Sequence, residues 1–224
     1  MIRIFFITGT DTGVGKTVLT TLLVRHLRKG GHDVGALKPI ASGDRNDARA
    51  LRAALGGGLS LDQINPWSFR APLSPLVAAR REGRKVWQRD ILNYVRRFGR
   101  DFDPMLIEGA GGLLSPLGED FDSRDLIVSL QATPLIVVPN RLGAVNLVRL
   151  TLAALPQTPR RNARVVFMNP RRPNAASRTN PELIAEFMPR GRVHELPWLA
   201  RGQTNGTRQL SPAAGSVLRI LMEE

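Results

Sequence analysis

The sequence contains no cysteine and few histidines, which are the residues that most often bind transition metals. Without cysteine the chain cannot form a disulfide, use a thiol nucleophile, or bind zinc or an iron–sulfur cluster through thiolates. The three histidines are scattered at positions 26, 32 and 194, so a site with several histidine ligands is excluded as well. The lack of cysteine is consistent with a reducing compartment.

Long hydrophobic runs are also missing. No segment approaches the ~20 consecutive apolar residues that a helix needs to cross a bilayer. The apolar stretch at residues 2–7 is too short for a signal peptide, and it leads into a glycine loop rather than a cleavage site. We therefore expect a cytoplasmic protein without a membrane partner.

Lysine is rare, although the chain is strongly basic. Four of the 32 basic residues are lysines, and the 19 acidic residues leave a net charge of +13. Such a charge can indicate binding to nucleic acid or to an anionic membrane. The arginines are dispersed and no recognised nucleic-acid motif accompanies them, so a solvated basic surface is favoured. We expect no nucleic-acid partner, and a basic ATP-dependent nucleic-acid-binding protein is kept as an alternative.

The length of 224 residues suits one sizeable domain with a hydrophobic core. Apolar runs rich in β-branched and aromatic residues alternate with stretches of helical period. This alternation predicts an α/β fold with a mostly parallel sheet and helices on both faces. We treat residues 1–224 as a single domain.

The same patterns predict the individual elements. The expected strands are residues 2–8, 33–38, 105–108, 135–139 and 164–168. The expected helices are residues 17–29, 47–55, 74–82, 87–98 and 145–155. Residues 65–75 are expected to form an ordered loop, and residues 170–181 and 201–212 are expected to form mobile surface loops.

The strongest motif lies between the first expected strand and helix. Residues 9–17 contain the phosphate-binding pattern G-x-x-x-x-G-K-T in the required strand–loop–helix context. Backbone N–H groups and the positive end of the helix would surround a β-phosphate. Lys16 would reach between the β- and γ-phosphates, and the Thr17 hydroxyl would bind Mg²⁺. The motif predicts a P-loop NTPase-like fold that uses ATP and Mg²⁺.

Three further residues are candidates for the same crevice. Lys38 follows a strand end, and the carboxyl ends of parallel strands are where such sheets bind ligands. Glu108 ends an apolar strand, where a solvated glutamate is improbable and a magnesium ligand or water-holding residue is favoured. Asp47 begins an expected helix, so metal binding and N-capping are both open for it.

These motifs and several downstream segments resemble the dethiobiotin synthetase family of biotin biosynthesis. The matching segments are residues 9–12, 14–17, 38–43, 47–48, 65–75, 108–112, 142–146, 169 and 197–199. They occur in family order over most of the chain, from about residue 2 to 200. The sequence departs from the family pattern at Arg141, where lysine is frequent, and at Leu76, where many members have histidine.

The resemblance implies an ATP- and Mg²⁺-dependent ring closure. CO₂ would carboxylate 7,8-diaminopelargonic acid to a carbamate, and ATP would phosphorylate the carbamate to a carbamic–phosphoric anhydride. Attack by the second amine would then form the cyclic urea, dethiobiotin, with release of ADP and phosphate. The resemblance also implies a homodimer in which the neighbouring subunit contacts the carboxylate tail of the substrate.

The resemblance further implies roles for individual residues. Lys16 and Lys38 would be catalytic and would stabilise carbamate and γ-phosphate oxygens. The metal ligands would be Thr17, Asp47 and Glu108. The substrate contacts would be Thr12, Ser42, Gly143, Ala144, Val145 and Asn146. The ATP contacts would be Gly9, Gly13, Val14, Gly15, Lys16, Thr17, Val18, Asp47, Glu108, Gly109, Ala110, Gly111, Asn169, Pro170, Pro197, Trp198 and Leu199.

Other P-loop proteins of related fold are the main alternative. Partitioning and metallocentre-assembly ATPases usually carry a second lysine early in the loop, whereas residues 10–12 here are Thr-Asp-Thr. A different amide-forming or carboxylating ligase on the same scaffold is also left open.

Overall fold

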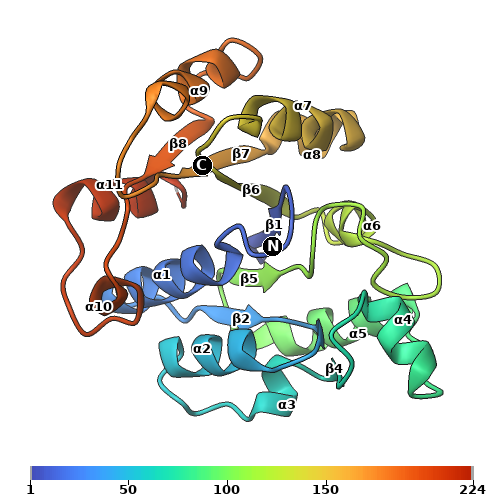
Figure 1. Cartoon of the computed structure of the whole chain (residues 1–224). Coiled ribbons are helices and arrows are strands. Elements are labelled where there is room, and N and C mark those ends of the chain that lie inside the picture. The colour runs from blue at the N-terminus through green and yellow to red at the C-terminus, as the bar shows by residue number, and fades with distance from the viewer. Residues whose placement is uncertain (1, 223–224) are drawn as a thin grey trace.

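A six-stranded sheet forms the centre of the molecule in the computed structural model, which describes residues 2–222 (Figure 1). All of its neighbouring strands are parallel. In spatial order the strands are β2 (Gly35–Leu37), β5 (Met105–Glu108), β1 (Ile4–Gly9), β6 (Thr133–Pro139), β7 (Arg164–Met168) and β8 (Val193–Leu196). The predicted α/β fold with a parallel sheet is confirmed.

Helices connect the strands, and a small second sheet lies beside the main one. The longer helices are α1 (Lys16–Lys29), α2 (Asn46–Ala54), α4 (Pro75–Arg81), α5 (Gln88–Phe98), α6 (Ser123–Ser129), α7 (Ala144–Ala154), α9 (Ala175–Ala185) and α11 (Pro212–Ile220). The shorter ones are α3 (Leu61–Ile64), α8 (Gln157–Asn162), α10 (Arg201–Thr204) and the 3-10 helix η1 (Gly99–Asp101). Strands β3 (Ile40–Ser42) and β4 (Trp67–Phe69) pair in parallel as the second sheet. None of the helices within residues 2–222 has the length and apolar character needed to span a bilayer.

Two hydrophobic cores cover the two faces of the main sheet. Successive side chains of a strand point to opposite faces, so Phe6 enters one core while Phe5 and Ile7 enter the other. The first core contains apolar residues of α4, α5, α6, α7 and α9, and the second contains those of α1, α2 and α11. Because both faces are buried, the strands are apolar at nearly every position, as parallel sheets require.

The topology places the predicted crevice at the end of β1. The chain adds β2 and β5 on one side of β1 and β6, β7 and β8 on the other, so the winding direction changes at β1. In open parallel sheets this switch point, at the carboxyl ends of the strands, is where ligands bind. The loop that follows β1 is residues 10–15, the glycine-rich motif.

Some of the expected loops are wrong. Residues 67–69 form β4, which pairs with β3, so the segment 65–75 is not loop throughout. Residues 175–181 belong to α9, whose start is stabilised by a capping box between Asn174 and Ser177. The buried side chains of α9 include Ser177, Asn180 and Pro181. Because two of these are polar and one is a proline, the segment lacks the apolar period that would predict a helix. Within residues 201–212, Arg201–Thr204 form α10 and Pro212 begins α11.

Candidate active site

The phosphate loop has the backbone that its motif predicts. Gly13 and Gly15 have φ angles of 71° and 101°, in the left-handed region that glycine adopts without strain. A Cβ on Gly9 would lie 2.6 Å from Cγ2 of Val14, so the loop also needs glycine for close packing. No side chain caps the start of α1, which leaves its first N–H groups available to an anion.

Lys16 crosses from the phosphate loop to the loop after β5. Its Nζ donates hydrogen bonds to the carbonyl oxygens of Asp11, at 2.9 Å, and Gly111, at 2.8 Å. Burial, together with repulsion by Lys38, lowers the pKa of Lys16 to about 8, against the attraction of nearby carboxylates. Lys16 is therefore a buried amine that lacks a directly bonded carboxylate, and phosphate oxygens would supply that negative charge.

Three oxygens meet where α1, α2 and β5 come together. The Thr17 Oγ1 lies 2.7 Å from Oδ1 of Asp47 and 2.8 Å from Oε1 of Glu108. One hydroxyl carries one proton, so it can donate to only one of the two carboxylates at a time. The other oxygen of Glu108, Oε2, is buried and has no hydrogen-bond partner among the described residues. The site thus holds more acceptor oxygens than its own donors satisfy.

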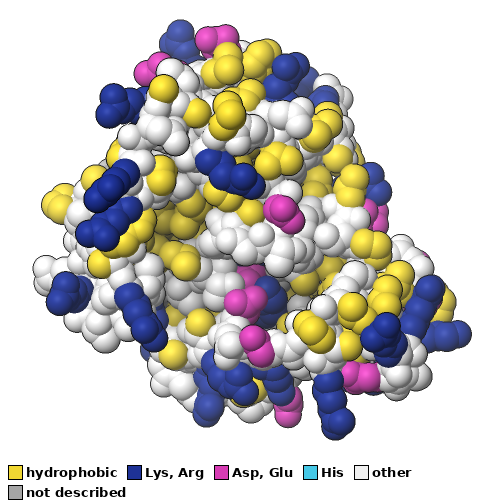
Figure 2. Space-filling view, viewed as in Figure 1, with side chains coloured by type: hydrophobic (Ala, Val, Ile, Leu, Met, Phe, Trp, Pro, Cys, Tyr) yellow, Lys and Arg dark blue, Asp and Glu magenta, His cyan; other side chains and the backbone are white. Residues whose placement is uncertain are grey.

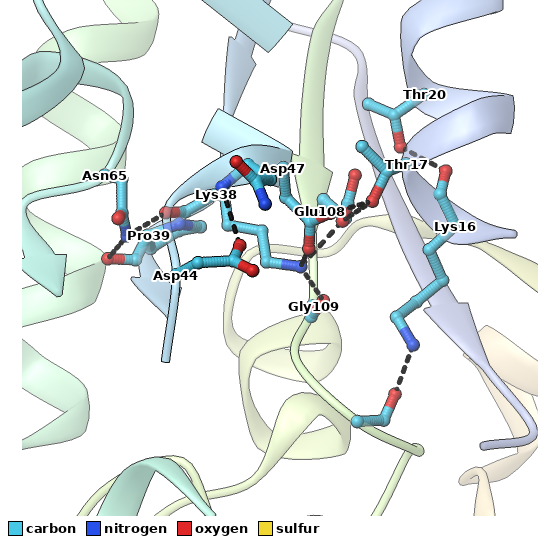
Figure 3. A network of polar contacts seen from close by, with 12 residues as sticks. Lys16, Thr17, Thr20, Lys38, Pro39, Asp44, Asp47, Asn65, Glu108 and Gly109 are labelled. Carbon is cyan, nitrogen blue, oxygen red and sulfur yellow. Dashed lines mark hydrogen bonds and ion pairs between the residues drawn. The ribbon is translucent and has the colours of Figure 1, made fainter. Parts of the chain in front are cut away.

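Lys38 completes this cluster from the end of β2 (Figure 3). Its Nζ lies 2.6 Å from Oδ2 of Asp47 and 2.7 Å from Oε1 of Glu108. It also donates to the carbonyl oxygen of Gly109, at 3.3 Å. Burial acts to lower the pKa of Lys38, but attraction to Glu108 and Asp47 outweighs it and the pKa is raised. The amine is therefore charged.

Asp47 belongs to this cluster and does not cap its helix. The N-cap residue of α2 is Arg45, and the N–H of Asn46, the first residue of the helix, donates to Oδ1 of Asp44 at 2.9 Å. Burial acts to raise the pKa of Asp47, but attraction and hydrogen bonding to Lys38 outweigh it, and the pKa is lowered. The sequence leaves metal binding and N-capping open for Asp47. In the structure Asp47 is not the N-cap residue, and its carboxylate lies beside Lys38 and Thr17. Burying ions costs desolvation energy, so such a cluster indicates function more than stability.

The cluster opens into a cavity of about 700 Å³, a size typical of small-molecule sites. Figure 2 shows a hollow in the middle of the face, with basic and acidic side chains next to each other. The expected residues that line the cavity are Thr12, Gly13, Gly15, Lys16, Thr17, Val18, Lys38, Ser42, Asp47, Ala110 and Gly111. The phosphate loop, the Lys38 loop and the loop after β5 therefore form one site.

Several lining residues were not predicted. They are Ala41, Gly43, Asp44, Pro72, Leu73, Ser74, Pro75 and Ser115. Residues 72–75 belong to a segment with family-like motifs, and Ser42 Oγ donates to the Leu73 carbonyl oxygen, at 2.5 Å. Ser115, whose Oγ accepts from the N–H of Gly112 at 2.9 Å, had no sequence signal.

The donor set is suited to Mg²⁺. Within residues 2–222 no group of three or more His, Asp or Glu side chains could hold a metal ion. Mg²⁺ is commonly bound by one or two carboxylates together with substrate phosphates and water, and it prefers oxygen. Thr17, Asp47 and Glu108 supply a hydroxyl and two carboxylates, and the buried Oε2 of Glu108, without a partner among the described residues, is an acceptor that suits a cation.

The expected residues near the adenine lie on the far side of the phosphate loop and do not line the cavity. A Cβ on Gly15 would lie 3.0 Å from Cε of Met168, so the end of β7 adjoins the loop. Asn169 follows β7, and its side-chain oxygen accepts from Nδ2 of Asn140, at 2.7 Å. Trp198 follows β8 and is 48% exposed, with the Arg171 guanidinium 5.4 Å from its ring centre.

The expected tail contacts at residues 143–146 also lie outside the cavity. Gly143, with φ of 88°, is the N-cap residue of α7, and Ala144 begins the helix. The preceding residue, Leu142, is 85% exposed. Within one chain, this turn and the Lys38 cluster are therefore separate.

Comparison with known proteins identifies similar sequences. A family model described as an AAA domain matches residues 3–204. The ATP-dependent dethiobiotin synthetase BioD of Akkermansia muciniphila is 38% identical over 186 residues, covering 83% of this chain and 87% of the relative. The protein of the same name from Bacillus subtilis (strain 168) is 36% identical over 188 residues, covering 81% of each. That from Anaeromyxobacter sp. (strain Fw109-5) is 46% identical over 157 residues, covering 68% of this chain and 70% of the relative.

Similar solved structures share the fold at low sequence identity. The MinD cell division protein of Aquifex aeolicus is 19% identical with a TM-score of 0.58, covering 99% of this chain and 98% of that one. A putative plasmid partition protein from Borrelia burgdorferi, bound to AMPPNP, is 12% identical with a TM-score of 0.59, covering 99% and 96%. These likenesses confirm the P-loop NTPase-like fold.

Proposed function

Because this chain belongs to the dethiobiotin synthetase family, we propose that its cavity holds 7,8-diaminopelargonic acid beside the γ-phosphate of ATP. The chain is an ATP-dependent cyclo-ligase that closes the ring of this diamine to form dethiobiotin. The observation that carries the assignment of the site is the position of Lys38. Its amine lies within 2.7 Å of Asp47 and Glu108 at the wall of a cavity that also contains Lys16 and Thr12.

The proposed reaction needs positive charge and alignment more than it needs a protein nucleophile. One amine attacks CO₂, forms an N–C bond and loses a proton, which gives a carbamate. A carbamate oxygen then attacks the γ-phosphorus and ADP leaves. The second amine attacks the carbamoyl carbon, loses a proton and expels phosphate, which closes the cyclic urea. The phosphoryl-transfer step brings two anions together, so electrostatic stabilisation and orientation dominate.

The residues of the site match these requirements. Lys16 would bind the β- and γ-phosphate oxygens, and Lys38 would bind carbamate and γ-phosphate oxygens. Mg²⁺, held by Thr17, Asp47 and Glu108, would neutralise phosphate charge. Thr12 and Ser42, which line the same cavity, would contact the diamine or carbamate. Gly9 and residues 13–18 with 109–111 would surround the phosphates, and Asn169, Pro170 and residues 197–199 would contact the adenine.

We propose a homodimer in which residues 143–146 of each subunit reach the substrate tail bound by the other. Their place outside the cavity of their own chain supports this arrangement. So do Leu142 and Leu150, large apolar side chains that are 85% and 60% exposed near this turn and on α7. Sedimentation should give twice the monomer mass. The variant Leu142→Arg should lower that mass and weaken substrate binding, whereas a wild-type monomer with full activity would contradict the dimer.

We further propose that residues 1–224 act as one ligase domain in the cytoplasm, where ATP is available. The test of the function is direct. Purified protein with ATP, Mg²⁺, bicarbonate and 7,8-diaminopelargonic acid should yield dethiobiotin by mass spectrometry, with one ADP per product. A folded protein that binds ATP but makes no dethiobiotin would reject the assignment.

Replacing Lys38 separates nucleotide binding from chemistry. The variant Lys38→Gln should still bind ATP, because the phosphate loop and Lys16 are untouched. Turnover should fall by about 100-fold or more, the range seen when a preorganised charge at a reacting centre is removed. The measurements are ATP affinity by calorimetry and product formation by mass spectrometry, and full activity would disprove the role of Lys38.

A further inference from the structure

The backbone of Lys38 is held on both sides by a segment that contributes no side chain to the cavity. The Lys38 N–H donates to the carbonyl oxygen of Ile64, at 3.0 Å. Its carbonyl oxygen accepts from Nδ2 of Asn65, at 2.8 Å. One residue later, the carbonyl oxygen of Pro39 accepts from the N–H of Trp67, at 3.1 Å. The short link between β2 and β3 is therefore fastened to residues 64–67, and Figure 3 shows Asn65 beside Lys38 and Pro39.

Asn65 is the centre of this arrangement, and its amide orientation is fixed by its partners. The side chain is buried, with 1% of the residue exposed. Its Nδ2 faces three carbonyl oxygens, those of Lys38 at 2.8 Å and of Pro39 and Trp67 at 3.4 Å. Carbonyls only accept hydrogen bonds, so the NH₂ group must lie on this side and Oδ1 on the other.

Arg45 binds the opposite side of the same residue. Its Nε donates to Oδ1 of Asn65, at 3.2 Å, and its Nη2 donates to the Asn65 carbonyl oxygen, at 3.0 Å. Arg45 is also the N-cap residue of α2, two positions before Asp47. One buried amide thus joins the backbone of Lys38 to the start of the helix that carries Asp47.

We propose that Asn65, held by Arg45, is a positioning residue that sets Lys38 and Asp47 relative to each other for catalysis. The proposal rests on the function proposed above for Lys38. A lysine side chain has four rotatable bonds, so its amine keeps one position only when its backbone and its carboxylate partners are both held in place. The 2.6 Å contact between the Lys38 amine and Asp47 closes a ring of interactions that passes through Asn65 and Arg45.

Removing the Asn65 amide leaves the Lys38 carbonyl buried without its donor, and the link between β2 and β3 then relaxes. A shift of about 1 Å in a catalytic group is enough to lower a rate by about 100-fold. A bound nucleotide would lie mainly against the phosphate loop, which Asn65 does not contact. The expected effect is therefore mainly on turnover, with a smaller change in nucleotide affinity through Asp47.

The experiment compares five proteins in the dethiobiotin assay: wild type, Asn65→Ala, Arg45→Gln, Arg45→Lys and the control Asp62→Asn. Asp62 forms an exposed ion pair with Nη1 of Arg45 at 2.8 Å, so its variant removes a neighbouring charge and spares the bonds to Asn65. We expect kcat to fall by about 10- to 100-fold in Asn65→Ala and by about threefold to tenfold in Arg45→Gln. The Kd for ATP should change less than about threefold in both, and Asp62→Asn should match wild type.

The conservative variant Arg45→Lys, which keeps the charge and one donor, should recover part of the kcat lost in Arg45→Gln. If Asn65→Ala does not fold, Arg45→Gln, whose site is partly exposed, carries the test. A lower melting temperature with unchanged kcat in both Asn65→Ala and Arg45→Gln would show a merely structural role and overturn the proposal. Absence of product from wild type would instead reject the proposed function.

Discussion

At the scale of single residues, the charged side chains of the site can be buried only because oppositely charged or hydrogen-bonding partners lie beside them. Glu108 is fully buried, and its Oε1 is shared between the Lys38 amine and the Thr17 hydroxyl. Replacing a buried pair by apolar groups can be neutral, but removing one partner leaves the other charge uncompensated. The effect of a mutation here therefore depends on which charge remains.

The variant Glu108→Gln tests this dependence. It keeps the shape of the side chain but removes one negative charge, so Lys38 retains only Asp47 and the proposed Mg²⁺ site loses a carboxylate. We expect kcat to fall by about 100-fold or more, and the Mg²⁺ concentration for half-maximal activity to rise. Activity measured against Mg²⁺ concentration checks this. The control Glu186→Gln, at the exposed C-cap residue of α9, should behave like wild type.

His194 predicts a pH dependence of stability that is separate from catalysis. Burial, with repulsion by Arg164 and Arg192, lowers its pKa from 6.5 to about 4. The unfolded chain therefore takes up a proton at higher pH than the folded chain, and stability from His194 is present above pH 6.5 and is lost as the pH falls toward 4. Its buried Nε2 has no hydrogen-bond partner among the described residues, which is consistent with a neutral ring.

The corresponding variant is His194→Gln. Between pH 7 and pH 5, wild type should lose about 1–2 kcal/mol more of its free energy of unfolding than this variant does. Urea denaturation at several pH values measures the difference. The variant His32→Gln, at an exposed histidine, should follow wild type. Parallel curves for wild type and His194→Gln would contradict the lowered pKa.

At the scale of helices and strands, regular patterns made some elements predictable. The strands at 105–108 and 164–168 have the predicted bounds, and α1 ends at Lys29 as predicted, since each has an apolar pattern with a clear end. Strands β3 and β4 were missed, because three residues are too few for a periodic pattern and their pairing is between distant segments. Strand β8 was missed for a similar reason, since His194 and Glu195 interrupt four residues.

The candidate site likewise contains parts that the sequence predicts and parts that it does not. The phosphate loop was predictable from local sequence, because its spacing and its strand–loop–helix context occur within one segment. The 2.7 and 2.8 Å contacts from Thr17 to Asp47 and Glu108 join three segments far apart in the chain. Their meeting follows from the order of β2, β5 and β1 in the sheet, which periodicity does not determine. Asn65 and Ser115 were missed as site residues for that reason.

Helix α9 provides a prediction at this scale, because its N-terminus is an identifiable capping box. The Asn174 side chain accepts from the Ser177 N–H at 2.9 Å, and the Ser177 hydroxyl oxygen accepts from the Asn174 N–H at 2.8 Å. The variant Asn174→Ala should lower the free energy of unfolding by about 1 kcal/mol. Arg172→Ala, two residues earlier at an exposed position, is the control. Equal stability of the two variants in urea would indicate that the cap contributes nothing.

At the scale of the whole molecule, the fold does not by itself determine the function. The fold is shared with the MinD and plasmid partition structures at 19% and 12% identity, so the architecture alone does not select a ligase. What distinguishes this chain lies in the loops at the carboxyl ends of β1, β2 and β5. There the second lysine is Lys38, after β2, and not an early residue of the phosphate loop.

The net charge of +13 supports the last prediction, which tests the nucleic-acid-binding alternative. Figure 2 shows basic side chains spread over this face and separated by hydrophobic and acidic ones, without a continuous stripe. Arg45, Arg80 and Arg124 are also engaged by carboxylates. Binding that rests on scattered charges neutralises few phosphates and releases few counterions, so it is weak even at low salt.

We therefore expect any DNA or RNA binding seen at low salt to disappear at about 150 mM salt, where screening is strong. Dethiobiotin formation should be the same with and without added DNA. Fluorescence anisotropy over a salt series measures the first, and the product assay measures the second. Arg80→Gln should lower the low-salt binding no more than Arg171→Gln does, because neither residue belongs to a continuous basic surface. Tight binding at 150 mM salt, with ATP hydrolysis stimulated by DNA, would instead favour the nucleic-acid-binding alternative.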